Sequence, residues 1–152
     1  MSIQFGPQLV SLHRLRGVQI GDGVFIGVDA IIETSYPQLV SIGDGVDLGM
    51  RTTIIAHQIG EPVDLSKPSV RIEPEAFVGP GSIVLPNVTI GRGAVVSAGS
   101  IVKRSVPPLT MVQGNPAEPV AECGVPLLRD TRLKDFYKRL RPIRPAAQRA
   151  VR

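Results

Sequence analysis

The sequence predicts an all-β solenoid, a fold in which short strands alternate with tight corners and successive coils stack on one narrow core. Two observations predict it. An aliphatic residue recurs every six residues along most of the chain, without interruption from Ile72 to Val102. The 152 residues also include 16 Gly and 14 Pro, but only four Phe, two Tyr and no Trp. A period of six matches neither a regular strand, which repeats every two residues, nor a helix, which repeats about every 3.6.

The repeat predicts which side chains form the core. Each aliphatic residue of the repeat is expected to point inward, and in nearly every case a small or β-branched residue follows four positions later, where the chain turns. Three six-residue units make one 18-residue coil, as the spacing from Ile72 to Ile90 shows. The chain therefore holds about four to five coils. The inward positions are Ile20, Ile26, Ile32, Ile42, Leu48, Ile54, Ile72, Val78, Val84, Ile90, Val96 and Val102.

Two insertions interrupt the repeat. The first coil takes 22 residues, with the extra residues around Tyr36, and the second, from Ile42 to Ile72, takes 30 and holds a loop at 58–69. Insertions in a solenoid become loops on one face, which is often the functional face. The longer loop starts directly after His57, so this point of the chain is a candidate site.

The residue before each inward position points outward, and it is often apolar. A contiguous apolar strip on the outside of a solenoid indicates an interface, so we expect an oligomer. The residues of this strip are Phe25, Ile31, Phe77, Ile83, Val95 and Ile101.

The repeat ends at Pro107, and a helix is expected over 130–141. Four apolar residues fall there at the spacing of one helix face, namely Leu133, Phe136, Tyr137 and Leu140. Disorder is expected over 142–152. The chain thus divides into an N-terminal segment (1–17), the repeat domain (18–120, with the loop 58–69), and a C-terminal helix with a basic tail (121–152).

The formal net charge of +4 is concentrated at the C-terminus, where residues 129–152 hold nine basic residues and two acids. Such a tail could contact RNA, a membrane surface or a phosphate, but a solvated end is the favoured reading, and we expect no nucleic-acid partner. The single Cys123 excludes an internal disulfide and fits a reducing compartment. Neither a signal peptide nor an apolar run long enough to span a membrane is evident, so a cytoplasmic location is expected.

Two histidines are the main candidates for chemistry. His13 lies before the repeat and is expected at the surface, whereas His57 is either a polar residue at a strand end or a functional group beside the loop. No metal is expected, because the two histidines and Cys123 lack the spacing of a ligand set. No pattern for a Ser–His–Asp nucleophile is present.

The run from Ile90 to Arg104, followed by Val106-Pro107-Pro108 and Gly114-Asn115-Pro116-Ala117, resembles the hexapeptide-repeat acyltransferases. The resemblance is strongest to the branch of maltose, galactoside, xenobiotic and capsule-sugar acetyltransferases. It implies a left-handed parallel β-helix, to which the apolar spacing described above adds one C-terminal α-helix. It further implies a homotrimer with active sites between subunits, acetyl-CoA as the acyl donor, and His57 as the general base.

The resemblance also implies binding residues. Asp29 corresponds to an acceptor-binding position, where it either binds the acceptor or caps a turn; Glu33 and Ser35 lie near the same corner. Glu118 stands where relatives carry a cation, so Arg129 or the tail is a substitute phosphate ligand. The matched coenzyme A positions are Gly79, Ser97, Ala98, Gly99, Lys103, Arg104, Pro108, Asn115 and Pro116.

Together these features predict an enzyme that transfers an acetyl group directly from acetyl-CoA to a hydroxyl or amine of a small acceptor such as a sugar, amino sugar or amino acid. A non-catalytic β-helix scaffold is the alternative. A carbonic anhydrase of the same fold is disfavoured, because its metal needs three histidines and the chain has two.

Overall fold

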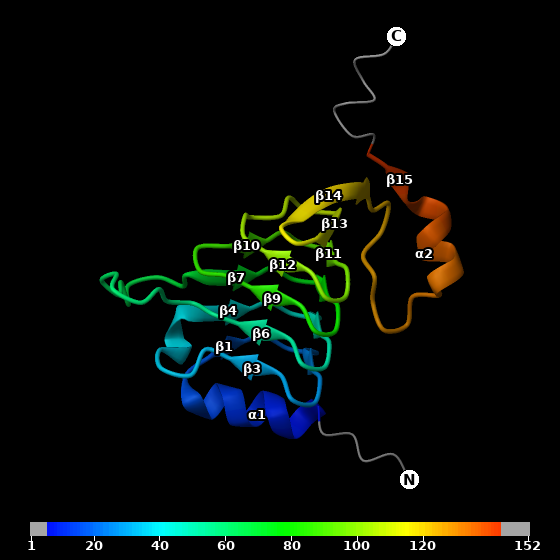
Figure 1. Cartoon of the computed structure of the whole chain (residues 1–152). Helices are drawn as coiled ribbons and strands as arrows, with labels where there is room; N and C mark the ends of the chain where they lie inside the picture. The colour runs from blue at the N-terminus through cyan, green and yellow to red at the C-terminus, as the bar shows by residue number, and fades with distance from the viewer. Residues whose placement is uncertain (1–5, 144–152) are drawn as a thin grey trace.

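The computed structural model describes residues 6–143, and it forms a parallel β-helix with three sheets (Figure 1). Each coil contributes one short strand to each sheet, and equivalent strands of successive coils pair in parallel register. The predicted period is confirmed, because eleven of the twelve inward positions are at most 2 % exposed and only Ile20, in the first coil, is half-buried.

The first sheet is outwardly polar. Its outward side chains are Gln19, Ser41, Arg71 and Thr89, in register with one another. The strands, in spatial order, are β1 (Gln19–Ile20), β4 (Val40–Ile42), β7 (Val70–Ile72) and β10 (Thr89–Ile90).

The second sheet is extended by a hairpin and by a last short strand, which pair antiparallel beyond the repeat. The six-residue repeat does not predict this extension, since it lies after the repeat ends. The sheet runs β2 (Phe25–Ile26), β5 (Asp47–Leu48), β8 (Phe77–Val78), β11 (Val95–Val96), β13 (Thr110–Gly114), β14 (Ala117–Glu122) and β15 (Arg141–Pro142).

The third sheet carries the outward residues Ile31, Thr53, Ile83 and Ile101 in one register. No segment of residues 6–143 pairs beyond either edge of this sheet. Its strands are β3 (Ile31–Ile32), β6 (Thr53–Ile54), β9 (Ile83–Val84) and β12 (Ile101–Val102).

The corners between the second and third sheets need a left-handed backbone. The residues at this corner in successive coils are Asp29, Arg51, Gly81 and Gly99, with φ of 60°, 57°, 70° and 72°. Glycine adopts this conformation without strain, and an aspartate tolerates it better than most residues. Asp29 therefore meets a backbone requirement of the repeat.

A helix that the sequence did not predict, α1 (Gly6–Arg16), lies at the N-terminal end of the β-helix. It ends at Gly17, whose φ is +109°. The other short helical segment is the 3₁₀ turn η1 (Pro37–Leu39), which occupies the first insertion. The second insertion forms a loop between β6 and β7 that projects from the body (Figure 1).

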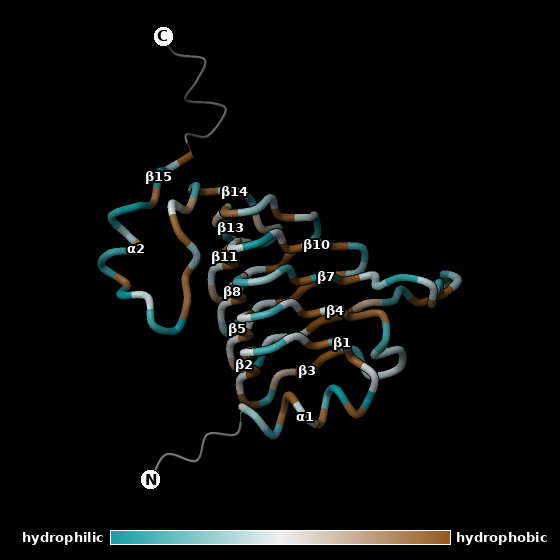
Figure 2. Tube along the Cα trace, turned by 180° about the vertical axis from the view of Figure 1, so that it is seen from behind, coloured by the Kyte–Doolittle hydropathy of each residue, from teal (hydrophilic) through white to brown (hydrophobic). Residues whose placement is uncertain are grey.

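The C-terminal segment lies along the second sheet (Figure 2). It contains α2 (Leu133–Arg139), within the expected helix, and buries Phe136 with Val95 and Cys123. Two residues of the predicted apolar face, Leu133 and Tyr137, are instead 57 % and 59 % exposed, because only one side of this short helix meets the sheet. The prediction of disorder over 142–152 is wrong at its start, because Pro142 belongs to β15 and Ile143 donates its backbone N–H to Val120, while residues 144–152 lie outside the described residues.

The predicted apolar strip is therefore divided between two sheets. Phe25, Phe77 and Val95 belong to the second sheet, where Val95 is covered by the chain's own C-terminal segment. Ile31, Ile83 and Ile101 belong to the third sheet and remain outward.

Candidate active site

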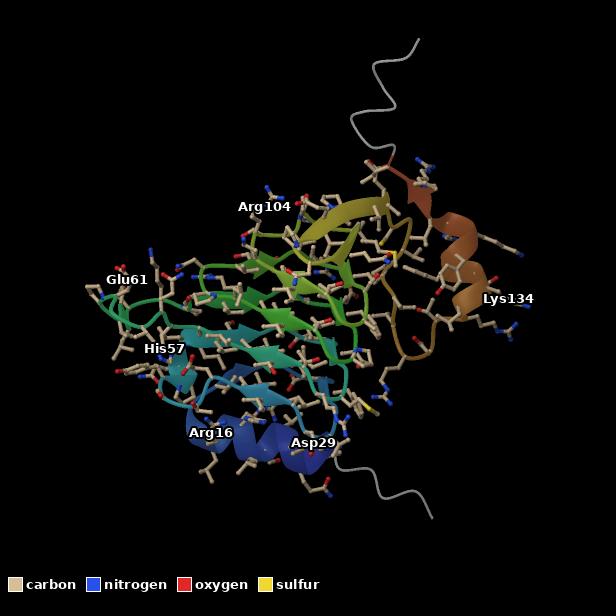
Figure 3. All side chains as sticks on the ribbon, viewed as in Figure 1. Arg16, Asp29, His57, Glu61, Arg104 and Lys134 are labelled. Atoms are coloured by element: carbon tan, nitrogen blue, oxygen red, sulfur yellow. The ribbon has the colours of Figure 1, made fainter. Side chains whose placement is uncertain are left out.

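His57 stands at the corner that follows β6, where the chain leaves the third sheet and enters the long loop (Figure 3). Ile54 and Ala56, just before it, are 1 % and 2 % exposed, so the backbone is anchored in the core. The side chain of His57 is 27 % exposed. A rigid coil thus holds the imidazole at the surface, beside a loop.

Glu33 holds the inner side of this imidazole. It follows β3 in the preceding coil, and the parallel register of Ile32 with Ile54 brings the two corners together. The Glu33 Oε2 atom lies 2.9 Å from His57 Nδ1, and the Glu33 side chain is only 1 % exposed. The carboxylate is therefore behind the histidine and away from solvent.

Both Glu33 oxygens are occupied. Oε2 also accepts a hydrogen bond from the Ala56 backbone N–H at 2.8 Å, and Oε1 accepts from the N–H groups of Ser35 and Tyr36 at 2.9 and 3.2 Å. Burial alone would raise the pKa of Glu33, but the hydrogen bonds from His57, Ala56, Ser35 and Tyr36 outweigh it and hold the pKa at about 2. Glu33 is thus a carboxylate at any physiological pH.

This charge state decides the tautomer of His57. An ionised carboxylate can only accept, so the neutral imidazole donates from Nδ1 and keeps its lone pair on Nε2. The Tyr36 ring packs edge-on against the imidazole, with centroids 5.2 Å apart and an interplanar angle of 79°. The histidine is held from two sides, and its free nitrogen can accept a proton.

A cavity of about 130 Å³ adjoins His57. It is lined by loop residues between 58 and 69, including Gln58, Glu61, Asp64 and Lys67, and by Leu39, Ala56, Pro86 and Asn87. Both insertions contribute to it, since Leu39 belongs to η1. Polar and apolar side chains are mixed on its walls, and the loop supplies both kinds, which suits a small molecule with polar groups.

The three residues expected to contact an acceptor lie in different surroundings. Ser35 is beside Glu33 and donates its backbone N–H to it. Glu33 faces His57 from the interior instead of lining the cavity, because its oxygens are used up inside the protein. Asp29 precedes β3 whereas Glu33 follows it, so Asp29 lies at the opposite corner, where it pairs with Arg51 at 3.8 Å (Figure 3).

The expected coenzyme A residues flank the third sheet on both sides. Gly79 and residues 97–99 form corners before β9 and β12, on the Asp29 side. Lys103 and Arg104 follow β12, two coils along the His57 edge, and Arg104 is paired with Glu118. Further positions lie away from this sheet: Pro108 precedes β13, and Asn115 and Pro116 form the hairpin turn between β13 and β14.

One expectation about a single residue is corrected, and one suggested ligand is found in another contact. His13, expected at the surface, is 5 % exposed on α1, because this unpredicted helix packs it against the first coil. Arg129, a suggested phosphate ligand, lies 3.8 Å from Asp47 and 3.7 Å above the Phe25 ring. It anchors the C-terminal segment on the second sheet.

Two protein-family models match the chain. The model described as bacterial transferase hexapeptide (six repeats) matches residues 69–104, and that described as hexapeptide repeat of succinyl-transferase matches residues 17–56. A curated relative from Escherichia coli K12, WbbJ, which is described as a lipopolysaccharide biosynthesis O-acetyl transferase, is 30 % identical over 139 residues. The match covers 77 % of this chain and 70 % of WbbJ. The chain belongs to the hexapeptide-repeat transferase family.

A further curated protein and a solved structure are similar to the chain. YvoF of Bacillus subtilis strain 168 is 34 % identical over 100 residues, which cover 65 % of this chain and 57 % of YvoF. The chain thus spans little more than half the length of this relative. A hexapeptide-repeat acetyltransferase of Vibrio cholerae, solved with acetyl coenzyme A, superposes with a TM-score of 0.61 at 31 % identity, over 70 % of this chain and 61 % of that one. The fold is the expected left-handed parallel β-helix.

The described residues carry neither a metal-binding cluster nor a membrane-spanning helix. Residues 6–143 contain no group of three or more His, Cys, Asp or Glu that could hold a metal ion. Neither α1 nor α2 in that range has the length and hydropathy of a membrane-spanning helix.

Proposed function

We propose that the protein transfers an acetyl group from acetyl-CoA to a hydroxyl or amine of a small acceptor, with His57 as the general base. The observation that carries this proposal is the His57–Glu33 pair at the edge of the cavity: a buried carboxylate on Nδ1 and a free Nε2. Family membership supports acetyl-CoA as the donor, since the Vibrio cholerae relative was solved with that molecule.

The reaction is a direct transfer. His57 Nε2 takes the proton of the acceptor hydroxyl or amine as its oxygen or nitrogen attacks the thioester carbonyl. The tetrahedral intermediate collapses by breaking the C–S bond, and the imidazolium returns the proton to the departing coenzyme A sulfur. Glu33 stays ionised throughout and stabilises the transient imidazolium charge.

Cys123 has no role as an acyl carrier in this scheme. It is 4 % exposed under the C-terminal segment, and burial raises the pKa of its thiol to about 11. Since the thiolate is the nucleophilic form, such a cysteine is unreactive at neutral pH.

Glu33 is a positioning residue in this proposal, and the acceptor is instead assigned to the cavity formed by the loop 58–69. Gln58, Glu61, Asp64 and Lys67 are its polar contacts there. The volume of about 130 Å³ favours an acceptor, or an acceptor end group, of amino-acid or single-sugar size.

The active form is proposed to be a homotrimer in which third sheets meet. Ile31, Ile83 and Ile101 present apolar surface there, with Ile31 52 % exposed, while the C-terminal segment covers the second sheet and the first sheet is polar outside. Such packing brings the corner of Gly79 and residues 97–99 of one subunit near the His57 edge of the next. Coenzyme A would then lie between subunits.

The test is release of free thiol from acetyl-CoA across a panel of amino acids, amino sugars and sugars, with wild type and His57→Ala in parallel. Thermal shift with coenzyme A accompanies it, because binding to the native state alone raises the melting temperature. Stabilisation without turnover on any acceptor would favour the scaffold alternative, and the absence of both would contradict the proposal.

A further inference from the structure

Helix α1 closes an open edge of the β-helix. β1 and β3 are the edge strands of their sheets, so carbonyls of the first coil have no preceding coil to donate hydrogen bonds to them. Two arginines of α1 donate instead, Arg14 to one corner and Arg16 to another. The carbonyls that accept these bonds are Ile20 and Gly21 from Arg14, and Ile32, Glu33 and Thr34 from Arg16.

The guanidinium of Arg16 spans the segment that carries Glu33. Nη1 donates to the Ile32 carbonyl at 3.2 Å, and Nη2 donates to the carbonyls of Glu33 and Thr34 at 2.7 and 3.4 Å. A planar guanidinium, with its five N–H donors, is suited to several carbonyls at once. Arg16 therefore fixes the main chain at the point where the Glu33 side chain begins.

His13 fixes Arg16 in turn. The His13 Nδ1 atom lies 3.1 Å from Arg16 Nη1, and since a guanidinium only donates, Nδ1 is the acceptor. Burial, with a smaller contribution from the Arg16 charge, lowers the pKa of His13, which keeps the ring neutral and able to accept. The two histidines of the chain are thus joined through Arg16 and Glu33.

We propose that Arg16 is a positioning residue of the active site, acting on His57 through Glu33. Its carbonyl contacts hold residues 32–34 in register, and this register sets the 2.9 Å contact between the Glu33 carboxylate and His57 Nδ1. Without Arg16 the segment is released at its open edge, and the carboxylate no longer selects one tautomer of His57. The expected effect on kcat rests on the proposed function, whereas the expected effect on the His57 tautomer does not.

The experiment compares Arg16→Met with Arg14→Met. Both variants remove an α1 arginine that caps the same edge, but Arg14 contacts the corner at Ile20 and Gly21, away from Glu33. Two readouts are used: the ¹⁵N chemical shifts of the His57 imidazole, which report its tautomer, and kcat and KM for thiol release. The chain has only two histidines, so the ring signals are readily assigned.

We expect Arg16→Met to convert His57 from mainly the Nδ1–H tautomer to a mixture and to lower kcat about tenfold, with KM for acetyl-CoA within about twofold. Arg14→Met is expected to leave both readouts at the wild-type values, although its melting temperature should fall by about as much as that of Arg16→Met. Arg16→Lys, which keeps the charge but offers a single ammonium group, should fall between wild type and Arg16→Met.

If Arg16→Met and Arg14→Met have the same tautomer and the same kcat, Arg16 only caps the edge and the inference is overturned. A changed tautomer in Arg16→Met would uphold the positioning role even if the wild type transferred no acetyl group, in which case only the proposed function would fail. Should Arg16→Met not fold, Arg16→Lys against Arg14→Lys gives the same comparison.

Discussion

Glu33 is a buried carboxylate, and its four hydrogen bonds explain how the protein keeps a negative charge in its interior. An ionised group without partners would be strongly destabilising there. Three backbone N–H donors and the His57 ring supply those partners, and the pKa of about 2 reflects their combined effect.

A pH dependence of stability follows from this lowered pKa. The folded value lies below the ordinary value of 4.5, so the contribution of Glu33 is present above about pH 4.5 and is lost as the pH falls toward 2. Glu33→Gln should therefore lower the free energy of unfolding at pH 7, by on the order of 3 kcal/mol, and the difference from wild type should shrink toward pH 2. Urea denaturation from pH 2 to 7 measures it.

Glu73→Gln is the matched control for this prediction. Glu73 follows β7 as Glu33 follows β3, but it is exposed. Its replacement should leave unfolding within about 0.5 kcal/mol of wild type at every pH. A Glu33→Gln variant whose stability parallels that of Glu73→Gln would show that the buried carboxylate contributes nothing.

The sequence singles out His57 as a candidate base but does not indicate that Glu33 is its partner. His57 is conspicuous because an insertion starts beside it, whereas the sequence suggests Glu33 only as a candidate acceptor ligand near Asp29, which itself either binds the acceptor or caps a turn. The two acids lie on either side of a two-residue strand, and such a strand sends its flanking residues to opposite corners. Only the register between coils shows that Glu33 meets the His57 corner and that Asp29 does not.

At the scale of elements, the predicted apolar strip is divided because its residues lie in two different sheets, and the C-terminal segment covers only one of them. Phe25, Phe77, Ile83 and Ile101 occupy the same position of the repeat, so periodicity alone treats them alike. Which sheet is covered depends on where the chain turns back after β14, and this is set by tertiary packing. The sequence does not predict helix α1, because few of its residues are buried and its apolar residues do not follow a clear helical spacing.

Phe136 should hold this segment in place. It is 2 % exposed and packs with Val95 and Cys123. Phe136→Ala is expected to destabilise the segment by about 3 kcal/mol, through loss of the buried ring and the cavity left behind. Hydrogen exchange should therefore quicken over residues 121–143 while the coils keep their protection.

Tyr137→Ala on the same helix is the control, since Tyr137 is 59 % exposed. Tyr137→Ala should change the free energy of opening of the segment, as measured by hydrogen exchange, by less than about 0.5 kcal/mol. Equal effects of the two substitutions would mean that the segment is not held by its contact with the second sheet.

At the scale of the whole molecule, the third sheet is the surface that the proposed trimer requires. Ile83 lies in its middle, between Thr53 and Ile101 in register. In a trimer, Ile83→Glu would place three carboxylates close together at the subunit contact and remove them from water. Because burying unpaired charges is costly, the variant should sediment as a monomer.

Arg71→Glu is the control, because Arg71 lies at the centre of the polar first sheet. This substitution changes the net charge of the protein more than Ile83→Glu does, but it should leave the trimer intact. Sedimentation velocity distinguishes these cases. A wild type that sediments as a monomer, or an Ile83→Glu variant that remains a trimer, would rule out assembly through this face.

The most direct test of the central claim is the rate of thiol release from acetyl-CoA by His57→Ala, on the best acceptor of the panel. Because a general base contributes roughly a hundredfold or more, the variant should lose at least that factor in kcat while it keeps the coenzyme A thermal shift and the oligomeric state of the wild type. A His57→Ala enzyme that turns over within about threefold of wild type would contradict the assignment of His57 as the base.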